Sequence, residues 1–173
     1  MDLILLAGNS IDNKEWIEEV KSVFIPFFSL TQIQYYDHWQ SGKELIDLNK
    51  EIKKLTETTK SKKQYVIFAK SAGILVTLKA IFEKKISPCK CIFIGIPLNW
   101  ANKYGFDINT WFKNFDLPSL IIQHTNDPIA SIRELSKFLK KENVANYNLV
   151  ELSGNDHYYS EIDKIKDLTT NFI

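Results

Sequence analysis

Residues 65–80 read YVIFAKSAGILVTLKA, and this stretch decides which fold the chain can adopt. It opens with an unbroken apolar run, which is typical of a strand that helices bury on both faces of a parallel sheet. From Ile74 onward, apolar residues return at helical spacing as far as Phe82. Two small residues, Ala72 and Gly73, lie between the patterns. The sequence therefore predicts a buried strand that turns tightly into a helix around Ser71.

Further apolar runs predict more strands, and amphipathic segments separate them. The predicted strands cover residues 3–7, 33–37, 65–69, 91–95, 119–124 and 147–152. Apolar stripes predict helices over residues 16–24, 45–55, 74–82, 132–139 and 162–168. Asp12 and Glu15 are spaced as a variant of the capping box before the first helix. Because strands and helices alternate, we predict a three-layer α/β/α sandwich around about six mainly parallel strands.

Length and composition narrow the class of protein. The chain has 173 residues, 45% of them hydrophobic and 25% charged, and 22 Lys and Arg nearly balance 21 Asp and Glu. We expect one domain over residues 1–173, with no nucleic-acid or membrane partner. The N-terminus does not resemble a signal peptide, and no apolar run approaches the roughly 18 residues of a membrane span. A cytoplasmic location is therefore expected.

Three residues that can carry chemistry follow predicted strands. Ser71, Asp127 and His157 come shortly after the third, fifth and sixth strands. In an open α/β sheet, ligands bind beyond the carboxyl ends of the strands, so these side chains are expected to lie at one edge. A serine hydroxyl needs a base to become nucleophilic, and histidine, with an ordinary pKa of about 6.5, suits that role. A carboxylate can orient its ring. The three residues favour nucleophilic acyl transfer.

Four segments resemble the α/β-hydrolase family. Residues 65–80 are similar to its nucleophile elbow, G-x-S-x-G, and LILLAGNS (3–10) to its first strand and oxyanion loop. PSLIIQHTNDPIAS (118–131) is similar to its acid loop, and VELSGNDHYYS (150–160) to its final histidine loop. The resemblance spans nearly the whole chain. It implies the roles of nucleophile, acid and base for Ser71, Asp127 and His157, and the spatial strand order 2-1-3-4-5-6.

The resemblance also implies how a reaction intermediate would be stabilised. The backbone N–H of Ala72 would be one donor of an oxyanion hole, and that of Asn9 or, as the second choice, Ser10 would be the other. The chain departs from the family pattern in three ways. Ala69 replaces the first glycine of the elbow, and Ala7 stands where many members have histidine. The antiparallel strands and large helical cap of bigger members are absent, so the chain resembles a compact, esterase-like member with a minimal cap.

Each residue of the proposed site has a second interpretation. Ser71 could be only a helix N-cap, because serine is favoured at that position. Asp127 could be a turn residue before Pro128, and His157 could be a surface loop residue. Asp156 is a rival acid, although it adjoins His157 in the sequence.

The remaining histidines and the cysteines give no pattern of metal ligands. We interpret His38 as structural or solvated, and His124 as buried and hydrogen-bonded rather than part of a pocket. Cys89 and Cys91 are two residues apart and are expected to be reduced core thiols. Since no zinc-ligand spacing occurs, we expect no metal site. We also expect no cofactor, because nucleophilic acyl transfer by a serine requires none.

One segment interrupts the alternation of strands and helices. Residues 96–118 carry several aromatic residues without clean periodicity, and the segment is longer than most loops. It either packs its aromatic side chains onto the core or forms a small lid over a substrate. Trp100, Tyr104 and Trp111 are the candidate substrate contacts.

These observations favour a serine hydrolase acting on a small-molecule ester, or on a thioester or amide, of a small to medium acyl group. The intermediate would be an acyl group on Ser71. Two alternatives remain: a non-catalytic interaction module with the same fold, and an acyltransferase that uses the same residues. A flavodoxin-like sheet is disfavoured, because residues 7–12 hold one glycine and an acidic residue, a poor cradle for phosphate. The oligomeric state is left open.

Overall fold

The computed structural model describes residues 1–173 and contains one sheet in which all neighbouring strands are parallel. Its strands are β1 (Asp2–Leu6), β2 (Leu30–Ile33), β3 (Tyr65–Lys70), β4 (Lys90–Ile94), β5 (Ser119–His124) and β6 (Tyr147–Leu152). Their order across the sheet is β2-β1-β3-β4-β5-β6, which confirms the predicted order. Because the strands are parallel, their carboxyl ends share one edge of the sheet.

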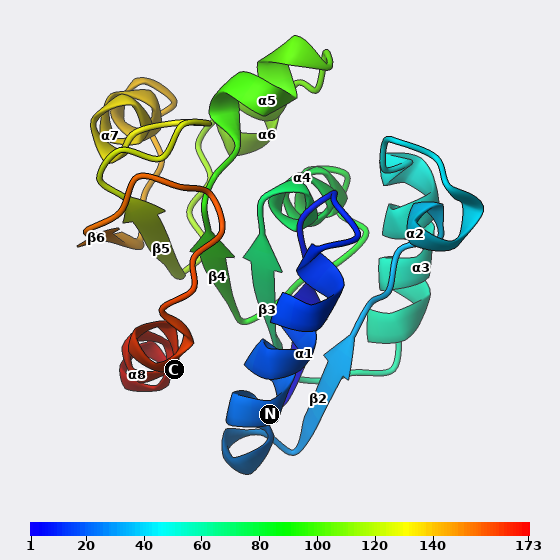
Figure 1. Ribbon diagram of the computed structural model, residues 1–173. Coiled ribbons are helices and arrows are strands. Elements are labelled where there is room, and N and C mark those ends of the chain that lie inside the picture. The colour runs from blue at the N-terminus through cyan, green and yellow to red at the C-terminus, as the bar shows by residue number, and fades with distance from the viewer.

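Helices cover both faces of the sheet and give the molecule three layers (Figure 1). They are α1 (Asn13–Phe24), α2 (His38–Ser41), α3 (Leu48–Thr59), α4 (Ala72–Phe82), α5 (Leu98–Lys103), α6 (Ile108–Phe112), α7 (Ile132–Lys141) and α8 (Ile162–Phe172), with a 3₁₀ turn, η1 (Ile25–Phe27), after α1. No helix has both the length and the apolar character that crossing a membrane requires.

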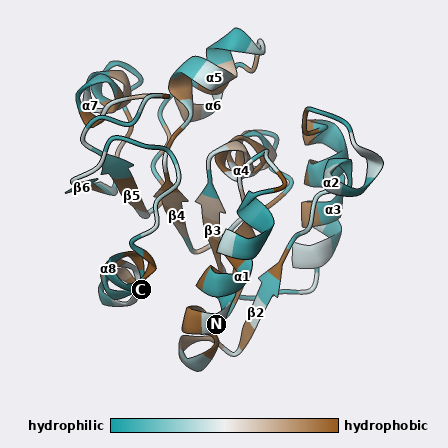
Figure 2. Cartoon of the chain, viewed as in Figure 1, coloured by the Kyte–Doolittle hydropathy of each residue, from teal (hydrophilic) through white to brown (hydrophobic).

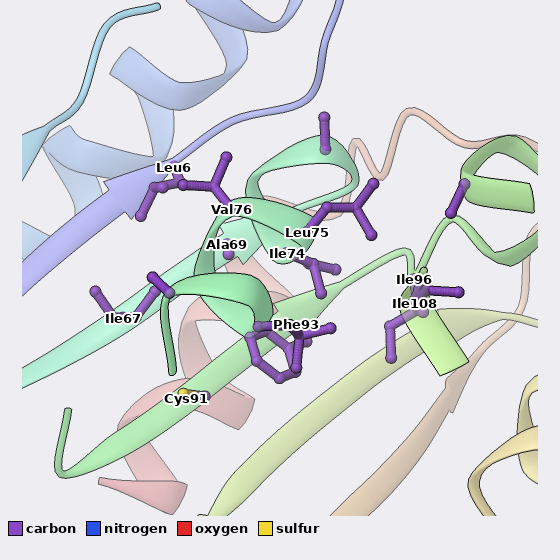
Figure 3. Close-up of a cluster of buried hydrophobic side chains, with 14 of the residues drawn as sticks. Leu6, Ile67, Ala69, Ile74, Leu75, Val76, Cys91, Phe93, Ile96 and Ile108 are labelled. Carbon is purple, nitrogen blue, oxygen red and sulfur yellow. The ribbon is translucent and has the colours of Figure 1, made fainter. Parts of the chain in front are cut away.

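The alternation of side chains along each strand divides the core into two clusters. On β3, Ile67 and Ala69 belong to a cluster with side chains of α3, α4, α6 and α7. Val66 and Phe68 belong to a second cluster with side chains of α1 and α8. Figure 3 shows part of the first cluster, including Phe93 of β4. β3 and β4 are correspondingly hydrophobic along most of their length (Figure 2). Burial on both faces explains why the central strands are continuous apolar runs.

The second strand differs from its prediction. It covers Leu30–Ile33 and not residues 33–37. After Ile33 the side chains contact other elements: Gln34 Nε2 donates to both the backbone and the carboxylate of Glu51 in α3, and Tyr36 Oη donates to Ala7 O. Residues 34–36 have the composition of a strand, but these contacts end the ladder and lead the chain into α2.

Other local predictions also need correction. Asp12 has a helical backbone conformation and caps nothing; its carboxylate accepts from Ser10 Oγ. A complete capping box instead begins α7, between Ser131 and Glu134. Both cysteines are free, but Cys89, which precedes β4, is exposed, and only Cys91 lies in the core.

Candidate active site

The turn between β3 and α4 holds Ser71 in an unusual backbone conformation. Its φ is 49° and its ψ is −117°, a region that residues other than glycine rarely adopt. Ser71 occupies the N-cap position of α4, but its hydroxyl makes no capping bond to the helix and is left for other partners. Gly73 allows the turn to pack closely, since a Cβ there would lie 2.7 Å from Leu6 Cβ and 2.8 Å from Ala7 O. The small residues of the motif thus bring the start of α4 against β1.

The Ser71 hydroxyl begins a chain of hydrogen bonds that ends at Asp127. Ser71 Oγ lies 2.9 Å from His157 Nε2, and His157 Nδ1 lies 2.7 Å from Asp127 Oδ2. An ionised carboxylate can only accept, so Nδ1 carries the proton and Nε2 is left to accept from the serine. The structure thus brings together the three residues that the sequence predicted, from the ends of β3, β5 and β6.

The Asp127 carboxylate is buried and fully engaged. Its Oδ1 accepts from the N–H of Ile129 at 2.8 Å, and its Oδ2 accepts from Tyr159 Oη at 2.6 Å as well as from His157. Burial alone would raise the pKa of this carboxyl, but the hydrogen bonds and the His157 ring hold it below its usual range. Asp156 instead accepts from the N–H groups of the turn that follows it, so Asp127 is the residue that faces the histidine ring.

Tyr159 is a member of this site that the sequence did not reveal. Its buried hydroxyl accepts from the N–H of His124 at 3.0 Å while it donates to Asp127. Burial and the Asp127 charge raise the pKa of this phenol well above its usual value, so it remains a donor. Its carbonyl accepts from Trp16 Nε1 at 2.8 Å, which ties the loop to α1. Gly95 leaves room for the ring, because a Cβ there would lie 2.7 Å from it.

Asn9 is held on several sides at the end of β1. Its carbonyl oxygen accepts from His38 Nε2 at 2.7 Å and from Trp39 Nε1 at 2.8 Å. Its side chain donates to Glu44 O and accepts from the N–H of Ile46. These bonds fix the peptide group between Asn9 and the next residue, because the atoms of a peptide lie in one plane. His38 is therefore a buried structural residue, and α2 serves as a support for the loop that starts with Asn9.

The N–H groups of Ser10 and Ala72, the other predicted donors of the oxyanion hole, lie at the same edge of the sheet as Asn9. Ser10 and Asn9 both line the cavity that contains Ser71. Ala72 is the first residue of α4, so its N–H has no partner within the helix. The positive end of the α4 dipole adds to the field at this point.

A cavity of about 390 Å³ opens beside Ser71. Most of the residues that line it are of polar types: Asn9, Ser10, Asp12, Asn13, Lys70, Ser71, Trp100, Ile129, Asp156, His157 and Tyr158. Of the predicted substrate contacts, only Trp100 lines this cavity. Trp111 lines a separate hollow beside α3, and Tyr104 packs against Trp100 with ring centroids 5.0 Å apart.

The segment 96–118 forms α5, α6 and the turns around them. Ala101, Ile108 and Phe112 are buried in the first core cluster, so the segment packs much of its apolar surface onto the domain. His124 is buried between the carbonyl of Asp156 and the carboxylate of Glu161, in agreement with its structural interpretation. No group of three or more histidine, cysteine and acidic side chains is arranged to hold a metal ion.

Comparison with known proteins gives structural but not sequence matches. No protein-family model and no curated protein matches the sequence. Est1E of Butyrivibrio proteoclasticus, solved with ferulic acid, superposes with a TM-score of 0.75 at 12% identity, over 99% of this chain and 88% of that one. A candidate hydrolase of the α/β superfamily from Xanthomonas campestris superposes with a TM-score of 0.69 at 10% identity, over 98% of this chain and 95% of that one. The RedJ thioesterase of Streptomyces coelicolor superposes with a TM-score of 0.70 at 11% identity, over 100% of this chain and 90% of that one.

Proposed function

We propose that this chain, which has the α/β-hydrolase fold, is a serine hydrolase that cleaves carboxylic esters through an acyl-Ser71 intermediate. One observation carries the proposal: the hydrogen bonds that link Ser71 Oγ to the His157 ring and that ring to Asp127. A binding module has no need of a serine joined to a base and a buried acid. The structural neighbours include an esterase and a thioesterase, which supports the same class of reaction.

In the first half of the reaction, Ser71 Oγ attacks the ester carbonyl carbon and His157 Nε2 takes the hydroxyl proton. The carbonyl electrons move onto the oxygen and then return as the bond to the alcohol breaks. His157 gives its proton to the departing alcohol. Water then attacks the acyl-Ser71 ester with His157 as base, which releases the acid and restores the serine. Asp127 keeps the ring oriented and stabilises the imidazolium.

The tetrahedral oxyanion needs donors that are in place before the reaction. The N–H of Ala72, at the start of α4, and the N–H of Asn9, with Ser10 as the second choice, would supply them. Removal of one such donor in other enzymes costs about 3–4 kcal/mol of transition-state stabilisation. The bonds from α2 to the Asn9 carbonyl would fix the Asn9–Ser10 peptide, and with it the N–H of Ser10, through the cycle.

The cavity argues for a small substrate. Its volume of about 390 Å³ lies at the lower end of the range for small-molecule sites. Trp100 and Ile129 supply apolar wall, whereas most other lining residues are polar. Such a site suits small or medium acyl groups better than long lipid chains.

The test is labelling with a fluorophosphonate, which traps a serine only when its base and oxyanion hole work. Purified wild-type protein should be labelled, and Ser71→Ala and His157→Ala should not. Ser153→Ala is the matched control, because Ser153 is an exposed serine on the loop that carries His157. Folded wild-type protein that resists the probe and hydrolyses no short ester would contradict the proposal.

A further inference from the structure

The last residue of β3 is a buried lysine that the proposed reaction does not use. Lys70 immediately precedes Ser71, and only 2% of its surface is exposed. Its Nζ donates to Asn13 Oδ1 at 2.7 Å. It also lies 4.6 Å from the centroid of the Trp16 ring and 5.1 Å from that of the Tyr158 ring, distances at which an aromatic face attracts a cation. These partners hold the ammonium without neutralising it.

The ammonium has no carboxylate partner in the protein. None of the ion pairs includes Lys70. Of its three donors, only one is used by an oxygen, that of Asn13. Burial lowers the pKa of Lys70 to about 8, against the opposing effect of the Asp127 and Asp156 charges. The group therefore stays mostly charged at neutral pH, and a buried charge without an opposite charge is costly.

Lys70 lies beside the reacting atoms and not in a separate site. Asn13 and Tyr158, which contact its ammonium, line the same cavity as Ser71. Two acidic residues line this cavity as well, but both are committed elsewhere. Asp12 accepts from Ser10 Oγ, and Asp156 accepts from backbone N–H groups with 58% of its side chain exposed. Water screens such exposed charges far more than a buried one.

We propose that Lys70 binds a carboxylate carried by the substrate, so that the enzyme selects small esters with a negative charge a few bonds from the cleaved ester. This inference rests on the proposed hydrolase function and names its substrate class. A carboxylate would accept a charge-assisted hydrogen bond from Nζ and restore charge balance in the cavity. The lysine ammonium carries a single positive charge, which one carboxylate balances.

The test compares esters that differ only in charge. In the first pair the acyl side carries a carboxylate (monoethyl succinate) or a methyl ketone (ethyl levulinate). In the second pair the alcohol side carries a carboxylate (O-acetylglycolate) or a methyl ketone (acetoxyacetone). In at least one pair, wild-type kcat/KM should be about tenfold or more higher for the anionic ester, as expected for a hydrogen bond between charged groups. The ratio should fall as the pH rises above about 8, where Lys70 loses its proton.

Variants separate charge from packing. Lys70→Met should abolish the preference while the neutral ester is still hydrolysed, and Lys70→Arg should keep it. Lys70→Gln retains a donor without the charge, so a preference that persists in this variant would overturn the proposal. Lys53→Met, which removes an exposed lysine of α3, should keep the wild-type ratio. If wild type hydrolyses both members of each pair equally well, only the role of Lys70 is overturned, and the proposed hydrolase function stands. If it hydrolyses none of the esters and the fluorophosphonate does not label it, the hydrolase function itself is overturned.

Discussion

Ser71 combines a candidate chemical role with a conformation that disfavours its own side chain. At φ 49° a Cβ atom crowds the backbone, which costs on the order of 1–3 kcal/mol. Ser71→Ala and Ser71→Gly both remove the hydroxyl, but only glycine removes the Cβ. We expect Ser71→Gly to be more stable than Ser71→Ala by about 1 kcal/mol in urea unfolding, because relief of strain exceeds the entropy that glycine loses on folding. Equal midpoints for the two variants would mean that the strain at Ser71 is no larger than the entropy that glycine loses on folding.

Tyr159 should act as a positioning residue through Asp127. In Tyr159→Phe the carboxylate loses a donor at 2.6 Å and the His124 N–H loses its acceptor. We expect kcat to fall roughly tenfold with little change in KM, and stability to fall by about 1–3 kcal/mol. Steady-state kinetics on a short ester together with urea unfolding would check both. A matching loss in Tyr35→Phe, at an exposed tyrosine that does not line the cavity beside Ser71, would count against a specific role.

The same variant carries a pH signature. The pKa of Asp127 is lower in the folded chain than its usual value, so this residue stabilises the fold above that value and the contribution is lost as the pH falls. The Tyr159 hydroxyl is among the groups that lower this pKa. Without it, the gain in unfolding free energy between pH 3 and pH 7 should be smaller than in wild type. An unchanged gain would show that the phenol does not stabilise the ionised carboxylate.

The sequence could identify Ser71, Asp127 and His157 because each follows a recognisable strand. Tyr159 gave no such signal, since its partner Asp127 is distant in the chain and an aromatic residue in a loop has many possible roles. Lys70 stands at the first x of the G-x-S-x-G motif, a position where the motif specifies no residue, so nothing in the sequence singled it out. Its burial and its lack of a carboxylate partner depend on α1 and on the loop that carries Tyr158, which pack around it only in the folded chain.

At the level of elements, α2 supports the active-site loop. This short helix supplies His38 and Trp39 to the carbonyl of Asn9. Trp39→Phe keeps an aromatic ring but removes the indole N–H. We expect kcat to fall about tenfold, KM to change little, and labelling by the fluorophosphonate to slow in parallel, because the N–H of Ser10, which shares a peptide with the Asn9 carbonyl, becomes less well fixed. If kcat is unchanged in a folded variant, the support from Trp39 is dispensable.

Long elements were predictable and short ones were not. β5 and β6 have the predicted bounds, because an apolar or alternating run of six residues is compatible with few structures other than a strand. α2 and α6 are too short to show a helical period. The strand predicted at 33–37 failed for a tertiary reason: Gln34 contacts α3 and Tyr36 contacts Ala7, just after β1, and a local sequence pattern cannot reveal such contacts.

For the molecule as a whole, we expect the 173 residues to unfold as one domain. Successive residues of β1 belong alternately to the two core clusters: Leu3 and Leu5 to one, Ile4 and Leu6 to the other. Neither cluster can therefore lose its packing without disturbing the strands of the other. Calorimetry should give one transition with equal calorimetric and van't Hoff enthalpies. Two separated transitions would mean that α5 and α6, or another part, form an independent unit.

The strand order also sets the sequence of events when the chain is made. β1 is synthesised first, yet its neighbours in the sheet are β2 and β3, and β3 begins only at Tyr65. The apolar β1 therefore cannot pair with β3 until residues 65–70 have been synthesised. Pairing between strands that are distant in the sequence makes folding slow. His157 emerges later still. A refolding chain should regain its helical signal before Ser71 regains the expected fluorophosphonate labelling, so the proposed activity would report the last step of folding.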